Sequence, residues 1–327
     1  MHPDPQTIQP LITELDELKR HCARLGETIQ TLLTERDELK QQCERLQELL
    51  SNVSYPPGHF YSPIVDVNDA QAIEAVRSRT RAQVPAGVRI DAEQMAKRIE
   101  QWAQDPVPFP FPRNRSSEYR FYFENPFFAC HDATALFSIL MEFRPRRVVE
   151  VGCGFSSALL LDANERFFEG GLDITLIDPA LDRLTSTFEW LRSPGARLLN
   201  QKVQDVSMEV FDRLEANDIL FIDSSHVSKT GSDVNHYLFR IVPRLKTGVL
   251  VHIHDILFPF EYLEDWVLKE KRSWNEAYLM HAFLQFNPFF EVIYWANFAW
   301  HRLHDALARL MPLCLENEGG SLWMRRR

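Results

Sequence analysis

Residues 11–50 repeat apolar side chains at spacings of four and then three positions. This heptad pattern is typical of an α-helical coiled coil, because it forms one continuous apolar seam along a helix. Leucine fills one seam position in every heptad, which makes that position d, whereas position a is mixed. The d residues are Leu11, Leu18, Leu25, Leu32, Leu39 and Leu46, and the a residues are Leu15, Cys22, Ile29, Arg36, Cys43 and Leu50.

Charged residues beside the seam predict that two such helices pair in parallel. Glu14 and Lys19 occupy a g position and the following e position, where side chains of two parallel helices meet, and Glu35 and Lys40 repeat the arrangement. Arg36 also favours two strands, because its long stem reaches solvent more easily from a dimer than from a trimer. We therefore expect a homodimer through a parallel coiled coil; the alternative is a single solvated helix.

The heptads end in a segment rich in proline and aromatic residues, which changes the character of the chain. Proline clusters at 51–66 and 105–114 predict turns and extended stretches, and the amphipathic runs 70–82 and 92–104 predict two short helices. The expected organisation is a coiled-coil helix over 1–50, a linker and lid over 51–126, and one domain over 127–327. Packing of the aromatic side chains on the domain surface is the alternative to a lid.

Beyond residue 127, short β-branched runs alternate with helical patterns. The alternation predicts an α/β fold, a mostly parallel seven-stranded sheet with helices on both faces. The last two runs precede the chain end, where we expect an antiparallel last strand to close the sheet edge. The strand candidates are RRVVEVG (146–152), ITLIDP (174–179), ARLLNQKV (196–203), DILFIDS (218–224), GVLVHIHD (248–255), FEVIYW (290–295) and SLWMRR (321–326).

Composition narrows the function classes. The chain has 327 residues, 45% hydrophobic and 25% charged, which is ordinary for a folded protein. Its net charge of -10 argues against a nucleic-acid partner, because phosphate binding needs clustered basic charge. We expect a cytoplasmic protein, since no apolar run is long enough for a membrane span and no signal-type segment opens the chain. Five cysteines without a Cys-x-x-Cys pair argue against a disulfide framework or a zinc ribbon.

The most informative stretch is VVEVGCGFSS at 148–157, a strand that runs directly into a glycine turn and a helical pattern. Gly152 and Gly154 lack a Cβ, so a ligand could approach the backbone closely. Glu150 could accept hydrogen bonds from an amino group. The next strand ends at Asp178, where an acidic side chain can bind both hydroxyls of a ribose.

This stretch resembles the first motif of class I S-adenosylmethionine-dependent methyltransferases, an acidic residue followed by alternating glycines, with serine here in place of the third glycine. The resemblance extends over 127–327 and implies a Rossmann-like methyltransferase domain with S-adenosylmethionine as its cofactor. It places Asp178 at the ribose and Asp205 at the adenine. The donor-binding residues that it implies are Glu150, Gly152, Gly154, Ser156, Asp178, Asp205 and Asp223.

A dinucleotide is the alternative ligand for this turn. Dinucleotide sites use G-x-G-x-x-G to seat a pyrophosphate on a helix N-terminus, and the third glycine would fall at Ser157. Glu150 would also face an anion unfavourably, whereas it suits the amino group of a methionine. The pattern therefore favours S-adenosylmethionine, and a Rossmann-like domain without a ligand is the remaining alternative.

A second group of polar residues follows the fourth and fifth predicted strands, at the sheet edge where α/β proteins bind ligands. We expect His226 to be the base that takes the acceptor's proton and His254 to be the second candidate, with Asp223 or Asp255 orienting the ring. Asp255 is the third catalytic candidate. His252 alternates with its neighbours in a strand, so we expect it beside the sheet rather than in catalysis.

Asp223, His254 and Asp255 also form a candidate metal site, because a mixed oxygen and nitrogen set could hold an Mg²⁺-like ion. This part is similar to metal-dependent sugar and catechol O-methyltransferases, which place acidic ligands after the fourth and fifth strands. His254 stands where those families often have an acid. Metal-assisted transfer, metal-free base catalysis and a purely structural network stay open at this stage.

The similarity to sugar O-methyltransferases, together with tryptophans in the C-terminal helices, favours O-methylation of a carbohydrate-like or other small hydroxylated acceptor, including a glycan. The alternative is a core position, because tryptophan at helical spacing is more often part of a core. The rival function is that of an interaction protein, in which the coiled coil joins partners and the Rossmann-like domain binds a ligand without catalysis.

Overall fold

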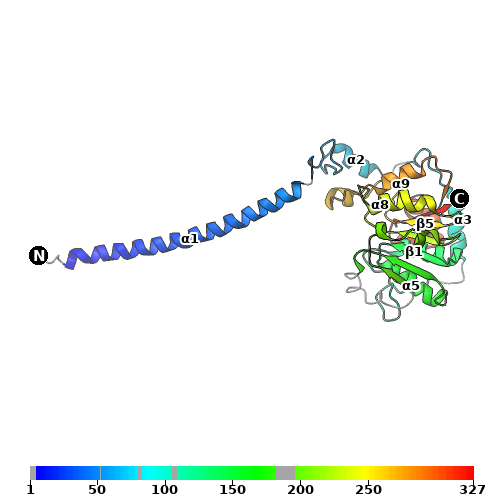
Figure 1. Ribbon diagram of the computed structural model, residues 1–327, viewed down its shortest axis with the longest axis horizontal. Coiled ribbons are helices and arrows are strands. Elements are labelled where there is room, and N and C mark those ends of the chain that lie inside the picture. The colour runs from blue at the N-terminus through cyan, green and yellow to red at the C-terminus, as the bar shows by residue number, and fades with distance from the viewer. Residues whose placement is uncertain (1–4, 52, 80–82, 105–108, 182–195) are drawn as a thin grey trace. The chain divides into compact units, whose positions relative to one another are not determined.

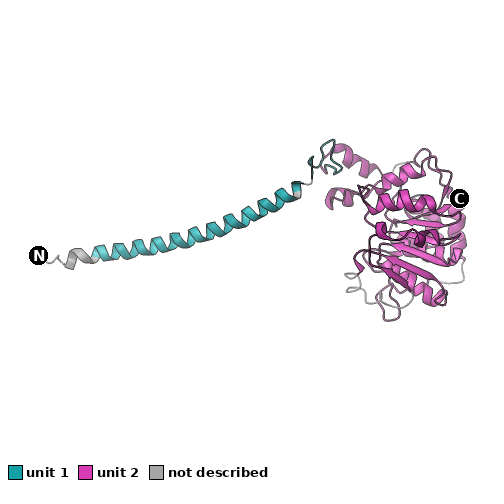
Figure 2. Cartoon of the chain, in the orientation of Figure 1, with its two compact units in different colours: residues 1–66 teal, residues 67–327 magenta. Residues whose placement is uncertain are grey.

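The structure, a computed structural model, describes residues 5–51, 53–79, 83–104, 109–181 and 196–327 (Figure 1). The chain divides into two compact units, residues 1–66 and residues 67–327 (Figure 2). Residues 67–126, expected as linker and lid, thus belong to the unit that contains the predicted domain. Over the described ranges, no helix combines the length and the apolar character that a membrane span requires.

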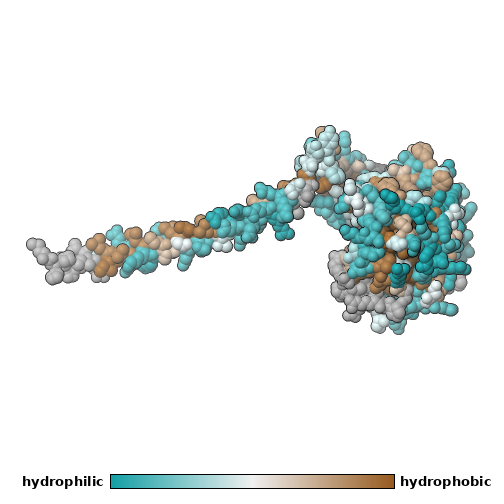
Figure 3. Space-filling view, in the orientation of Figure 1, coloured by the Kyte–Doolittle hydropathy of each residue, from teal (hydrophilic) through white to brown (hydrophobic). Residues whose placement is uncertain are grey.

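The first unit is built on one long helix, α1 (Pro5–Ser51), which confirms the predicted N-terminal helix. Pro56, Pro57 and Gly58 follow within a few residues, and such residues do not continue a helix. The leucines of the heptad seam lie in solvent along this single chain, with Leu11 at 64% and Leu39 at 61% exposure. Apolar side chains recur along the helix among polar ones (Figure 3).

The second unit contains a seven-stranded sheet in the order β3-β2-β1-β4-β5-β7-β6. Strands β1 to β5 pair in parallel, and β7 is antiparallel to both β5 and β6. The predicted Rossmann-like α/β fold with an antiparallel last strand is therefore confirmed. The strands are β1 (Arg147–Val151), β2 (Asp173–Ile177), β3 (Ala196–Leu199), β4 (Ile219–Ile222), β5 (Leu250–Ile253), β6 (Phe290–Trp295) and β7 (Leu322–Arg326).

Helices pack around this sheet, and the central strands are consequently buried on both faces. Val148, Leu220 and Val251, in three neighbouring strands, have no exposed surface. The helices are α2 (Ala70–Ser78), α3 (Ala92–Ala103), α4 (Cys130–Phe143), α5 (Phe155–Phe167), α7 (Glu209–Asp212), α8 (Asp233–His236), α9 (Glu276–Leu284), α10 (Ala296–Arg302) and α11 (His304–Leu310). Shorter 3₁₀ or π turns span Val203–Asp205, Tyr237–Ile241, Val242–Arg244, Asp265–Lys269 and Pro312–Leu315.

The aromatic segment before α4 contributes buried side chains to the second unit. Phe111, Phe121 and Phe123 are each less than a tenth exposed. Asp162 of α5 fixes the segment, because its carboxylate accepts the backbone N–H groups of Arg120 and Phe121 at 2.8 and 2.9 Å. These three side chains thus pack inside the second unit.

Candidate active site

The two glycines after β1 stand at the C-terminal edge of the sheet, beside β2 and β4. Gly152 has a φ of +86°, and a Cβ there would lie 1.6 Å from the backbone oxygen of Asp223. Its lack of a side chain therefore serves the close approach of the chain after β4. At Gly154 a Cβ would meet no atom within 4 Å, so the backbone at this point borders open space.

Glu150 lies inside the protein and does not face that space. Its side chain has no exposed surface, and its two carboxylate oxygens accept hydrogen bonds from the hydroxyls of Ser156 and Ser157 at 2.5 and 2.6 Å. Burial raises the pKa of Glu150 to about 8, although both serine hydroxyls act in the opposite direction. Ser156, which replaces the third glycine of the motif, thus helps to tie the turn to the strand.

Asp178 lies beside the glycine turn at the end of β2. One carboxylate oxygen accepts the backbone N–H of Cys153 at 3.1 Å, and the other accepts that of Ala180 at 2.7 Å. The residue is half-buried, whereas Asp205, in the 3₁₀ turn after β3, is exposed. The structure therefore brings Asp178 to the turn, and it places Asp205 after the next strand along the sheet.

Four of the predicted side chains meet beyond β4 and β5, which are neighbours in the sheet. The Nε2 atom of His226 lies 3.5 Å from an oxygen of Asp223 and 3.6 Å from an oxygen of Asp255. The other oxygen of Asp255 lies 3.6 Å from Nε2 of His254. We call these four residues the edge cluster. Its members come from two strand ends that are brought together only by parallel pairing.

Charges within the edge cluster shift its protonation. Burial lowers the pKa of His226, but the carboxylates of Asp223, Glu276 and Asp255 outweigh it and hold that pKa well above the usual value. The pKa of His254 is also raised, by Asp223 and Asp255 against the effect of burial. Burial raises the pKa of Asp255. Both shifts favour the imidazolium form, in which neither ring has a free nitrogen that could accept a proton.

Sequence reasoning missed the residues that hold the other side of His226. Oε2 of Glu276 lies 2.8 Å from Nδ1 of His226, and the hydroxyl of Tyr237 donates to Oε1 of Glu276. The ring of Trp274 lies 4.3 Å from the His226 ring, centroid to centroid. No local signal marks Glu276, because an acid in the first turn of a helix is ordinary.

His252 is packed inside the protein. It is fully buried, its Nε2 is 3.0 Å from the hydroxyl of Ser321, and its ring stacks on Phe221 at 3.7 Å. The structure thus places it within the sheet layer, as expected for a residue that alternates along a strand.

The predicted metal ligands Asp223, His254 and Asp255 have oxygen and nitrogen donor atoms. Within the described ranges, no group of three or more His, Cys, Asp or Glu side chains is placed to hold a metal ion. Asp255 instead pairs with His254 and His226, and Asp223 pairs with His226. This arrangement does not fit a metal site.

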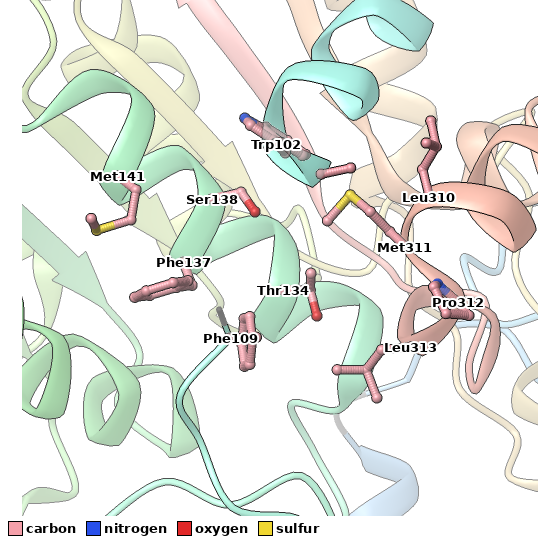
Figure 4. Close-up of a pocket in the computed structure, with 11 residues that line it drawn as sticks. Trp102, Phe109, Thr134, Phe137, Ser138, Met141, Leu310, Met311, Pro312 and Leu313 are labelled. Carbon is pink, nitrogen blue, oxygen red and sulfur yellow. The ribbon is translucent and has the colours of Figure 1, made fainter. Parts of the chain in front are cut away.

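A separate pocket of about 230 Å³ opens between α3, α4 and the 3₁₀ turn Pro312–Leu315 (Figure 4). Trp102, Phe109, Phe137 and Met311 give it a mainly apolar lining. None of the predicted site residues contributes to it, so it is distinct from the sheet edge described above.

Comparison with known proteins identifies the family. Residues 149–256 match the methyltransferase domain family. An uncharacterized protein of Archaeoglobus fulgidus is 34% identical over 184 residues, which are 54% of this chain and 82% of that protein. The chain belongs to the same family as this archaeal protein. Its methyltransferase-domain match covers the glycine turn, Asp178 and the whole edge cluster.

Solved methyltransferase structures show a distant likeness in arrangement. The SAH-bound Podospora anserina methyltransferase is 13% identical, with 81% of this chain and 98% of that chain covered and a TM-score of 0.40. An O-methyltransferase from Bacillus cereus in complex with SAH is 11% identical, with 77% and 96% covered and a TM-score of 0.39.

Proposed function

We propose that this protein is an S-adenosylmethionine-dependent methyltransferase that methylates an oxygen of a small hydroxylated, carbohydrate-like acceptor. The observation that carries the proposal is the open backbone at Gly154 beside the carboxylate of Asp178, within a methyltransferase-domain match. A half-buried turn that borders open space, next to a half-buried carboxylate, fits a nucleoside with an attached amino acid.

In the proposed donor site, residues around the glycine turn contact the three parts of S-adenosylmethionine. Gly154 leaves room for the methionine part, Asp178 accepts hydrogen bonds from the ribose hydroxyls, and Asp205 lies at the adenine. Glu150 and Ser156 act from inside, because their mutual hydrogen bond shapes the turn. Asp223 forms the boundary between this site and the edge cluster, since its backbone touches Gly152 and its side chain faces His226.

When bound, S-adenosylmethionine supplies a methyl carbon that bonds to the acceptor oxygen as its bond to sulfur breaks, with the electron pair left on sulfur. The edge cluster takes the proton that the acceptor hydroxyl loses. We assign this role to Asp255, because nearby carboxylates raise the pKa of His226 and of His254, which favours the form of each ring that already carries both protons. His226 and His254 flank Asp255 and orient its two oxygens.

The donor site can be tested with two aspartates at opposite ends of one strand. Asp178→Asn should weaken S-adenosylmethionine binding at least about tenfold in calorimetry, since an amide accepts from ribose hydroxyls through one oxygen only. Asp173→Asn, at the start of β2 and 49% exposed beside Arg213, is the matched control and should bind as the unmodified protein does. No binding by the unmodified protein, or equal binding by both variants, would refute the donor proposal.

The acceptor can be identified by an activity screen of candidate molecules. Hydroxylated sugars and other small alcohols should be offered with S-adenosylmethionine, and release of S-adenosylhomocysteine followed. Mass spectrometry of a product should show one added methyl on oxygen. A product methylated on nitrogen or carbon would overturn the oxygen assignment while it left the donor proposal intact.

We also propose that α1 joins two copies of the chain in a parallel coiled coil. The support is the row of leucines at d, which lie exposed in one chain, and the charged g and e positions beside them. Six leucines on one face of a helix would otherwise stay in water, and burying each is worth about 1.5–3 kcal/mol.

A further inference from the structure

His226 adopts a backbone conformation that only a specific environment sustains. Its φ is +58°, in the left-handed region that residues with a side chain rarely enter. Its backbone oxygen accepts the N–H groups of Asn275 and Glu276, each at 3.2 Å. The start of α9 therefore holds the backbone of a residue that lies far from it in sequence.

The segment at the start of α9 also holds the side chain of His226. The residue is 5% exposed, and its Nδ1 lies 2.8 Å from Oε2 of Glu276 while its ring rests against Trp274. Because a carboxylate only accepts, the hydrogen atom of this bond must reside on Nδ1. The opposite nitrogen, Nε2, is then the one that faces Asp223 and Asp255.

Glu276 is itself anchored in the protein interior. It is 1% exposed, and its second oxygen accepts the hydroxyl hydrogen of Tyr237, which is fully buried in the π turn after α8. A buried carboxylate is costly unless it is paired, and His226 and Tyr237 are the partners of Glu276 here. Tyr237, Glu276 and His226 form a continuous row of hydrogen bonds from the interior to the edge cluster.

We propose that Glu276 is a positioning residue for methyl transfer: it fixes the His226 ring with Nε2 toward Asp255, and Tyr237 fixes Glu276 in turn. This proposal rests on the proposed function. The fixed ring in turn orients the Asp255 carboxylate, because Nε2 of His226 lies 3.6 Å from one of its oxygens. Without Glu276 the ring can rotate about χ2, and Asp255 loses a fixed neighbour.

The test removes the charge of the Glu276 side chain and keeps its shape. Glu276→Gln keeps the shape of the side chain, so the variant should fold and bind S-adenosylmethionine within about twofold of the unmodified protein. It has no charge and only one acceptor oxygen where His226 and Tyr237 use two, so it should hold the His226 ring less firmly. With an acceptor from the screen, kcat should fall at least about tenfold while the KM for S-adenosylmethionine stays constant. Tyr237→Phe should shift kcat in the same direction by a smaller factor.

A spectroscopic signature separates positioning from general stability and needs no acceptor. In protein labelled with ¹⁵N-histidine, the Nδ1 and Nε2 signals of His226, assigned with His226→Asn, should shift in Glu276→Gln. Glu261→Gln is the matched control, because Glu261 also accepts a tyrosine hydroxyl, that of Tyr278 at 2.7 Å, at an exposed site. It should leave both the His226 signals and kcat unchanged.

Three results would overturn the proposal: unchanged ring signals in Glu276→Gln, an unchanged kcat, or a loss of rate matched by Glu261→Gln. If the unmodified protein fails to bind S-adenosylmethionine, the proposed function falls, and the ring signals still report whether Glu276 holds His226. The two failures are therefore distinguishable.

Discussion

Gly152 and Gly154 stand two residues apart in one turn, and the structure gives them different reasons to be glycine. At Gly152 a side chain would collide with protein backbone, whereas at Gly154 it would enter open space. The sequence pattern treats both as ligand contacts. At the residue scale, this difference separates positions that the fold requires from positions that a ligand requires.

Alanine at each glycine should therefore give opposite results. Gly152→Ala should destabilise the protein by at least about 2 kcal/mol in urea unfolding, because a clash and a left-handed φ each cost about 1–3 kcal/mol. Gly154→Ala should lower stability by no more than about 1 kcal/mol, the usual cost at a helix N-cap, yet weaken S-adenosylmethionine binding at least about tenfold. Full donor binding by a stable Gly154→Ala protein would contradict the assignment of that space.

Glu150 makes stability depend on pH in a definite direction. Its pKa is about 8 in the folded protein against 4.5 for a free side chain, so the folded state binds the proton more tightly. Its contribution is fully present below pH 4.5 and is lost as pH rises through 8. Relative to Glu150→Gln, which carries no charge, the unmodified protein should lose unfolding free energy between pH 5 and pH 8. Urea titrations whose difference stays constant over that range would contradict this expectation.

At the scale of elements, the heptads of α1 make the most regular signal in the chain, and the structure forms a single helix over all of them. The exposed apolar seam can be buried only by pairing with another helix, and the residues at position a report how two helices pair. Position a contains two exposed cysteines, Cys22 and Cys43. In a parallel, in-register pair each a residue faces its own copy, close enough for a disulfide.

Oxidation should therefore cross-link the proposed dimer, as seen on a non-reducing gel. Cys22→Ser and Cys43→Ser should each retain one cross-link. A variant with both changes and Gln41→Cys, which moves a thiol to the outward f position, should not cross-link through the helix. Cross-linking that disappears in both single variants would indicate that Cys22 faces Cys43 in an antiparallel pair, and a monomer in light scattering would refute the dimer.

At the scale of the whole molecule, strand order creates the site. The order β3-β2-β1-β4-β5 reverses direction between β1 and β4, and the glycine turn and Asp223 meet at that point. Ligands of open α/β sheets bind at such a reversal, because the connections leave in opposite directions and open a crevice. The donor turn and the edge cluster thus share one edge of one sheet, although separate stretches of sequence encode them.

Local sequence patterns were enough to predict the helix of the heptads, seven strands with their approximate bounds, and the strand ends that carry Asp178, Asp223 and Asp255. Periodicity reports which face of an element is buried, and a motif reports a local turn. The contacts of Glu150 with two serines and of Glu276 with His226 became known from the folded chain alone. These contacts depend on sheet register and helix packing between distant segments, and no local pattern of side chains contains that information.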